Sequence, residues 1–165
     1  MKYLYFLLFL PLLLGLTSCA GEPEVDMEDE RQQVMTLLDN FVKAHEEKNL
    51  DMLLSCFSDK PDITIIGTDR DELWVDKVSM GEAQRRAYET FGKVKLSVRD
   101  KILKLCSDGE IAWFYMKVNW YVESEGETST FDGIRTTGVL EKKGGKWAIA
   151  QIHTSMPVEG QAVRY

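Results

Sequence analysis

The chain has 165 residues, a formal net charge of -7 and 44% hydrophobic residues. This length is enough for one domain that buries its own core, and the hydrophobic fraction excludes a disordered chain. Because 27 acidic residues outnumber 20 basic ones, the surface should repel a phosphate backbone. We therefore expect one globular domain that binds no nucleic acid.

The N-terminus has the layout of a secretory signal. Lys2 precedes an almost continuous apolar run from Tyr3 to Leu16. Such a run is too short to cross a bilayer comfortably, but it suits the apolar region of a signal peptide. Residues 1–18 are therefore assigned to a signal peptide and excluded from the fold.

The end of this run resembles the lipobox of bacterial lipoproteins. In Leu16-Thr17-Ser18-Cys19-Ala20, leucine stands three positions before a cysteine and small residues fill the gap. The resemblance implies that Cys19 is lipidated and starts the mature chain, with a membrane holding its acyl chains. Ordinary secretion with a chance cysteine is the alternative. The expected location is the bacterial cell envelope, at the outer membrane or the cell surface.

The remaining chain divides into three segments. Residues 19–30 form an acidic tether, because the stretch from Ala20 to Glu30 holds six carboxylates and no large apolar cluster. Residues 31–158 form the folded domain, and residues 159–165 form a C-terminal tail. Cys56 and Cys106 are expected to be free thiols, with a disulfide between them as the alternative.

Helices are predicted in the first half of the domain. Apolar residues repeat at helical spacing over 34–45, and Asn49 suits the N-cap of a short helix that ends before Pro61. A third helix is expected from Ser79, because Ser79-Met80-Gly81-Glu82 has the capping-box pattern. His45 lies on the apolar face of the first helix, so we interpret it as a core residue rather than a base.

The second half changes to the two-residue period of β-strands. Two short strands are expected over 62–67 and 73–75, followed by long strands over 94–105, 111–122, 128–141 and 147–156. A slip in the apolar parity predicts a β-bulge near Asp100. Helices followed by an antiparallel meander predict an α+β fold, in which a curved sheet wraps around the helices.

The closing segment carries the most specific resemblance to a known family. Residues 135–140, Arg-Thr-Thr-Gly-Val-Leu, and the segment 145–157 are similar to a pattern that SnoaL-like proteins share with the association domain of calmodulin-dependent kinases. Residues 49–59 and 67–74 also look like the SnoaL-like branch of the nuclear-transport-factor-two-like superfamily. The resemblance covers about residues 31–158.

This resemblance implies a ketosteroid-isomerase-like fold. The chain would form a cone-shaped α+β barrel, a cystatin-like roll with three N-terminal helices packed in a curved mixed or antiparallel sheet. A deep pocket would lie between the sheet and the helices, and two copies would form a homodimer through the sheet. Members of this superfamily catalyse several reactions or only bind, so the fold alone does not give the function.

The catalytic positions of ketosteroid isomerases are vacant on this alignment. Those enzymes use an aspartate base with a tyrosine and a protonated aspartic acid, and the positions fall on Phe41, about Ile66 and near Thr137. None of these residues can do the corresponding work. SnoaL-type cyclases likewise need a pocket carboxylate, for which Glu72 and Asp76 are the candidates. The catalytic residues are therefore unknown, and we expect binding rather than catalysis.

Arg135 and His153 are the polar residues that we expect in the pocket. Strand parity groups His153 with Trp147 on one face of the last strand. Adjacent strands would bring the guanidinium and the imidazole together as a site for a carboxylate or another anion. The structural alternative is an ion pair between Arg135 and Glu72. Trp74, Glu72 and Tyr115 complete the expected ligand-binding set, although aromatic residues on a sheet are more often core.

Three hypotheses about function are open. The first is a membrane-anchored, non-catalytic domain whose pocket holds a small apolar or anionic molecule. The second is an isomerase, cyclase or dehydratase that uses Glu72, Asp76 or His153 as acid or base. The third is an interaction module of the cell envelope, with Trp113 or Trp120 on its docking sheet. No metal-ligand or nucleotide motif occurs in the sequence, so no metal and no other cofactor is expected.

Overall fold

The computed structural model describes residues 25–61, 63–158 and 160. The expected signal peptide, the lipidation site Cys19, the first part of the tether and all of the C-terminal tail except Gly160 lie outside the described residues. Within the described residues, no helix combines the length and the apolar character needed to span a bilayer.

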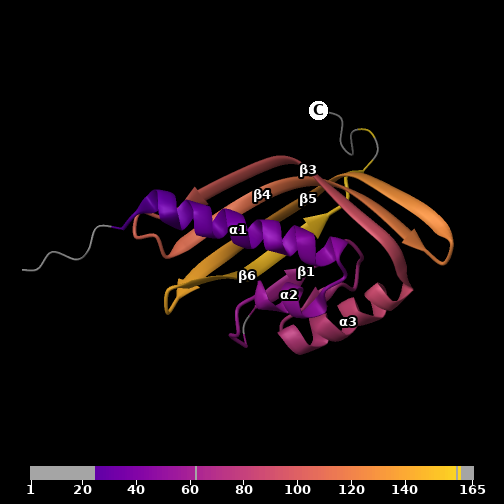
Figure 1. Cartoon of the computed structure of the whole chain (residues 1–165), viewed down its shortest axis with the longest axis horizontal. Helices are drawn as coiled ribbons and strands as arrows, with labels where there is room; N and C mark the ends of the chain where they lie inside the picture. Colours follow the sequence, from indigo (N-terminus) through magenta and orange to yellow (C-terminus); the bar gives the residue numbers. More distant parts are fainter. Residues whose placement is uncertain (1–24, 62, 159, 161–165) are drawn as a thin grey trace, which may run out of the picture.

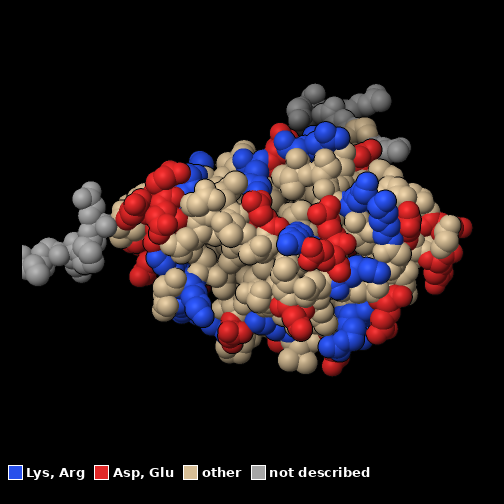
Figure 2. Space-filling model, viewed as in Figure 1, with Lys and Arg blue, Asp and Glu red and all other residues tan. Residues whose placement is uncertain are grey.

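Three helices form one layer of the molecule (Figure 1). They are α1 (Met27–Glu46), α2 (Leu50–Ser55) and α3 (Lys77–Thr90). Asn49 caps α2 as predicted, since its side chain accepts the N–H of Met52. Acidic side chains gather over the start of α1 in Figure 2, where its first turn is acidic. Negative charge at the N-terminal end of a helix interacts favourably with the helix dipole and so stabilises the helix.

Two helix starts differ from the predictions. α1 begins at Met27, within the stretch that we expected to be tether. α3 begins at Lys77, because Asp76 is its N-cap in place of Ser79. The carboxylate of Asp76 accepts two hydrogen bonds from Ser79, one from its backbone N–H at 2.8 Å and one from its side-chain hydroxyl at 2.7 Å. The serine that we expected to accept a capping hydrogen bond therefore donates one.

A six-stranded mixed sheet forms the other layer, with the order β2-β1-β6-β5-β4-β3. In chain order the strands are β1 (Thr64–Ile66), β2 (Leu73–Trp74), β3 (Phe91–Leu105), β4 (Ile111–Ser124), β5 (Glu127–Lys143) and β6 (Lys146–Ser155). Neighbouring strands are antiparallel except β1 and β6, which run parallel. The predicted α+β fold is confirmed.

The core lies between the helices and one face of the sheet, which we call the inner face. All three helices lie on the same side of the sheet (Figure 1). The largest fully buried side chains come from both layers: Val34, Leu38, Leu53, Ile63, Met116, Leu140 and Ile149.

Cys56 and Cys106 are both free, so the described residues contain no disulfide between them.

Irregular pairing marks the places where the long strands change phase. In β3 the register shifts between Val98 and Asp100, where a bulge was predicted. In β6 the pairs Val139–Gln151 and Leu140–Ile149 leave Ala150 as an extra residue. This second bulge was not predicted. It exchanges the faces onto which all later side chains of β6 point.

A buried carboxylate joins the start of α1 to the β5–β6 hairpin. Glu30 is only 6% exposed. One of its oxygens pairs with the ammonium of Lys142, and the other accepts the indole N–H of Trp147 at 2.7 Å. The hydrogen bond from Lys142 holds the pKa of Glu30 below its ordinary value, against the opposing effect of burial.

We expect Glu30→Gln to lower the free energy of unfolding by roughly 1.5 to 3 kcal/mol, the usual range for hydrogen bonds to a charged group. Because the folded pKa lies below the ordinary 4.5, this stabilisation is present above pH 4.5 and is lost as the pH falls through the folded value. Urea unfolding at neutral and acidic pH measures both effects. Glu28→Gln, an exposed change in the same helical turn, is the control; equal losses in the two variants would contradict the prediction.

Candidate functional site

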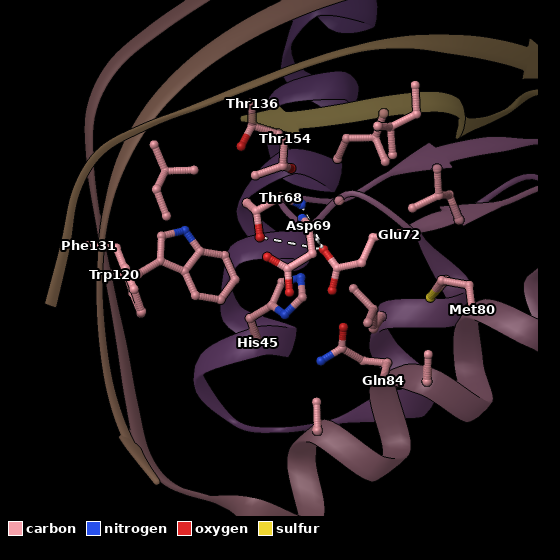
Figure 3. A pocket seen from close by; sticks show the side chains of 18 of the residues that line it. His45, Thr68, Asp69, Glu72, Met80, Gln84, Trp120, Phe131, Thr136 and Thr154 are labelled. Carbon is pink, nitrogen blue, oxygen red and sulfur yellow. Dashed lines mark hydrogen bonds between the residues drawn. The ribbon is translucent and has the colours of Figure 1, made fainter. Parts of the chain in front are cut away.

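A cavity of about 530 Å³ lies between the inner face of the sheet and the helices. Small-molecule pockets typically have volumes of this order. Helices α1, α2 and α3 form one side of it, strands β4, β5 and β6 form another, and the loop between β1 and β2 closes one end (Figure 3).

Most of the cavity wall is apolar. The large apolar lining residues are Phe41, Leu53, Phe57, Ile65, Ile66, Trp74, Met80, Phe91, Trp120, Phe131, Ile134 and Ile152. Phe41 and Ile66, which stand at two of the vacant catalytic positions, therefore face this cavity. Neither side chain carries a group that can move a proton.

A buried histidine forms part of the wall. His45 is 7% exposed, and its Nδ1 lies 3.0 Å from the hydroxyl of Tyr88 on α3. Its ring packs edge-on against Trp120, with 5.1 Å between ring centroids. Burial lowers the pKa of His45 to about 4, so the imidazole is neutral at pH 7. Within the described residues its second nitrogen makes no hydrogen bond.

Two further polar groups of the wall lack a protein partner. Thr136 is 3% exposed and lines the cavity, and no described residue bonds to its hydroxyl. The indole Nε1 of Trp120 is buried and also has no partner in the described part of the chain. Thr154 stands opposite Thr136 on the neighbouring strand and faces the same space (Figure 3). A buried polar group without a partner costs about 1 to 3 kcal/mol.

The β1–β2 loop brings two carboxylates to the cavity. Glu72 accepts the backbone N–H of Thr68 at 2.7 Å and that of Asp69 at 3.0 Å, so one of its oxygens holds the loop together. No described residue bonds to the Asp69 carboxylate. Both side chains extend into the cavity on the side where His45 lies (Figure 3). The described lining residues include no Lys or Arg.

The expected ligand-binding residues divide between the two faces of the sheet. Glu72 and Trp74 line the cavity. Tyr115 does not, because it lies on the outer face of the sheet beside Trp113 and Val139. Trp113 is exposed there, whereas Trp120 on the same strand faces the cavity.

The placement that we expected for Arg135 and His153 inside the pocket is wrong. Both side chains are exposed on the outer face, and their neighbours in the chain line the cavity in their place. For His153 the reason is the bulge at Ala150. Counting in twos from the buried Trp147 assumes an uninterrupted strand, but the extra residue turns His153 outward.

The alternative ion pair between Arg135 and Glu72 is absent as well. Arg135 donates a hydrogen bond to the backbone oxygen of Met156 at 3.2 Å. Asp76, the other proposed acid or base, caps α3, and its hydrogen bonds from Ser79 lower its pKa. Asp76 is also absent from the cavity lining. Its carboxylate therefore has a structural role.

Sequence reasoning missed the cavity roles of Asp69 and Thr136 and saw only the core role of His45. For Thr136 the sequence held a signal, because it shares strand parity with the apolar Ile134 and not with Arg135.

The described residues contain no cluster of three His, Cys, Asp or Glu side chains that would hold a metal ion.

The comparisons with known proteins agree with this architecture. The model of the SnoaL-like domain matches residues 34–159. A nuclear transport factor 2-like superfamily protein from Salmonella enterica serovar Typhimurium has a TM-score of 0.73 at 16% identity, over 84% of this chain and 99% of that chain. No curated protein matches this chain significantly.

Two other solved structures are similar in the same way. An NTF2-like protein of unknown function from Pseudomonas putida KT2440 has a TM-score of 0.67 at 14% identity, covering 80% of this chain and 89% of that one. A proposed calcium/calmodulin dependent protein kinase II association domain from Xanthomonas campestris has a TM-score of 0.67 at 22% identity, covering 78% and 89%. At these identities the likeness shows the fold alone.

We expect the free energy of unfolding to fall as the pH is lowered from about 6.5 to about 4. The pKa of His45 drops from an ordinary 6.5 to about 4 on folding, so in this range the unfolded chain binds the proton first. The loss amounts to about 3 kcal/mol and is complete below pH 4. Chemical unfolding at a series of pH values measures it.

His45→Gln should remove most of this slope above pH 4.5, where the protonation of Glu30 does not yet contribute. His153→Gln is the matched control, because His153 is exposed on the outer face. If the slope persists in His45→Gln, another group causes it and the prediction is wrong.

Proposed function

The chain belongs to the SnoaL-like domain family, and we propose that its domain binds a small, largely apolar molecule in this cavity without transforming it. The observation that carries the proposal is a pair of polar groups on two buried residues, His45 and Thr136, which line an apolar cavity and have no described protein partner. A ligand that bonds to these groups would recover part of their desolvation cost.

An isomerase, cyclase or dehydratase is less well supported. His153 lies on the outer face, and Asp76 caps a helix. One carboxylate oxygen of Glu72 already accepts hydrogen bonds from backbone N–H groups of its loop. Asp69 is the one cavity carboxylate that makes no side-chain bond with the described residues. The enzyme alternative therefore depends on Asp69 alone.

Of the two kinds of ligand that we expected from the sequence, apolar or anionic, the cavity favours the apolar one. Arg135 and His153, the residues that would have bound an anion, lie outside the cavity. Asp69 and Glu72 make one end of the cavity negative, and the described lining supplies no cation to offset them. A ligand without negative charge suits this wall.

The location of the domain is a second part of the proposal. A lipidated Cys19 would anchor the chain to a membrane of the bacterial cell envelope, through the tether that follows it. The support is the lipobox-like sequence from Leu16 to Cys19 at the end of an apolar signal.

A homodimer through the outer face of the sheet is a third part. In Figure 1 no helix lies over this face. Ile102 is 54% exposed and Trp113 is 44% exposed, and both lie beside Tyr115 in a shallow hollow. Exposed apolar groups in such a cluster support self-association.

We expect Thr136→Val to weaken the binding of 2-acetylnaphthalene, a neutral aromatic ketone, by about two- to ten-fold through loss of one hydrogen bond. Stability should not fall, because valine has the same shape and the threonine hydroxyl has no described partner. Isothermal titration of the full-length chain in detergent, with an empty-micelle blank, measures the affinity.

Thr137→Val is the matched control, since Thr137 is the next residue of the same strand and points outward. It should leave the affinity unchanged. Equal effects of the two variants, or no saturable binding to the parent chain, would contradict the proposal.

For the anchor, we expect Cys19→Ala to abolish metabolic labelling with a radioactive fatty acid and to leave the signal uncleaved. Cys106→Ala, which changes a half-buried thiol in the folded domain, should be labelled like the parent. Unchanged labelling of Cys19→Ala would show that the lipid is not attached there.

A further inference from the structure

We infer that the molecule held in this cavity carries a cationic amino group, which the carboxylates of Asp69 and Glu72 bind beside aromatic side chains. This inference rests on the proposed function and names the chemical class of the ligand. It starts from the charge of the cavity wall, where two acidic groups face the interior and the described lining contributes no Lys or Arg.

The two carboxylates have free capacity for a ligand. Glu72 uses one oxygen to hold the loop, and its other oxygen makes no bond with any described residue. The Asp69 carboxylate has no described partner at all. Neither group takes part in an ion pair within the described chain. Figure 3 shows them side by side, directed into the cavity. A donor that enters there meets two acceptors.

Other side chains of the same cavity independently indicate a polar ligand. His45 and Thr136 are each more than nine-tenths buried, and each presents to the cavity a nitrogen or hydroxyl without a described partner. Asp71 provides the contrast: Asp69 and Asp71 are both exposed residues of the same loop, but only Asp69 lines the cavity. The acidic pair therefore lies at the solvent-exposed end of a pocket whose deeper wall carries the buried His45 and Thr136.

The aromatic wall favours the same chemistry. Trp74, Trp120 and Phe131 line the cavity, and the face of an aromatic ring attracts an ammonium group by about 0.5 to 2 kcal/mol. His45 adds no opposing charge, because burial keeps its imidazole neutral above a pKa of about 4. An apolar body on the ammonium group would fill the remaining volume.

An organic ammonium fits this end of the cavity better than a metal ion. The described residues bring no third carboxylate, histidine or cysteine to the pair. Divalent metal ions in proteins usually need more ligands than two carboxylates supply. An ammonium donates three hydrogen bonds at most, and the two carboxylates with a neighbouring neutral acceptor can satisfy it.

Three naphthalene probes of similar shape test the inference: 1-(2-naphthyl)ethylamine is a cation, 2-acetylnaphthalene is neutral, and 2-naphthoate is an anion. Isothermal titration of the full-length chain in detergent at pH 7, with an empty-micelle blank, gives the three affinities. We expect the amine to bind at least about ten-fold more tightly than the ketone, and the anion to bind most weakly.

Two variants identify the residues responsible. Asp69→Asn should lower the affinity for the amine at least about five-fold, because it removes a negative charge from the cavity wall. The affinity for the neutral ketone should not change. Asp71→Asn removes a charge from the same loop outside the cavity and should change neither affinity. Glu72 is unsuitable for this comparison, since its substitution would also release the backbone of the loop.

The outcomes separate this inference from the proposed function. If the ketone or the naphthoate binds as tightly as the amine, or if Asp69→Asn and Asp71→Asn have equal effects on the amine, the cationic ligand is wrong and the binding function stands. If none of the three probes binds with saturation, the proposed binding function fails as well.

Discussion

Successive residues of a β-strand point to opposite faces, and the phase of this alternation decides which side chains reach the cavity. In β5 the phase turns Thr136 inward and Arg135 outward. In β6 the extra residue Ala150 shifts the phase, so that Thr154 faces inward and His153 outward. A register changed by one residue would replace two neutral hydroxyls with a guanidinium and an imidazole. In β6 the side chains that face the cavity therefore depend on the single inserted residue Ala150 as much as on the identity of its neighbours.

Helix α1 is attached to the rest of the fold at both ends. At its first turn Glu30 bonds to Lys142 and Trp147 of the β5–β6 hairpin. At its last turn His45 meets the hydroxyl of Tyr88 on α3. Polar contacts thus hold the two ends, while apolar packing holds the middle. Because buried polar contacts are directional, they fix the rotation and the axial position of the helix, and so determine where its side chains stand in the cavity wall.

Periodicity predicted the three helices, the long strands and the bulge near Asp100, because one core forces apolar side chains onto one face. It did not reveal the bulge in β6. Ile149 and Ile152 are three residues apart, so both can face the core only if the strand contains an extra residue. The sequence did not show where that residue lies, because Ala150 is small and apolar and suits either face. Periodicity could not predict the orientation of Asp69. The shape of its loop is determined by hydrogen bonds from backbone N–H groups to Glu72 and not by the period of a strand or helix. Glu72 and Trp74 do line the cavity, and their contact with a ligand stays a prediction.

The cavity has walls from segments that are far apart in the chain, on α1, the β1–β2 loop, α3 and the last three strands. No short fragment contains such a space, so a molecule bound there has affinity for the folded chain only. By mass action, a ligand at a hundred times its dissociation constant adds about 2.7 kcal/mol to the free energy of unfolding. That is a substantial share of the margin by which domains of this size are stable. A filled and an empty domain would therefore differ in their susceptibility to proteases that cleave transiently opened chains.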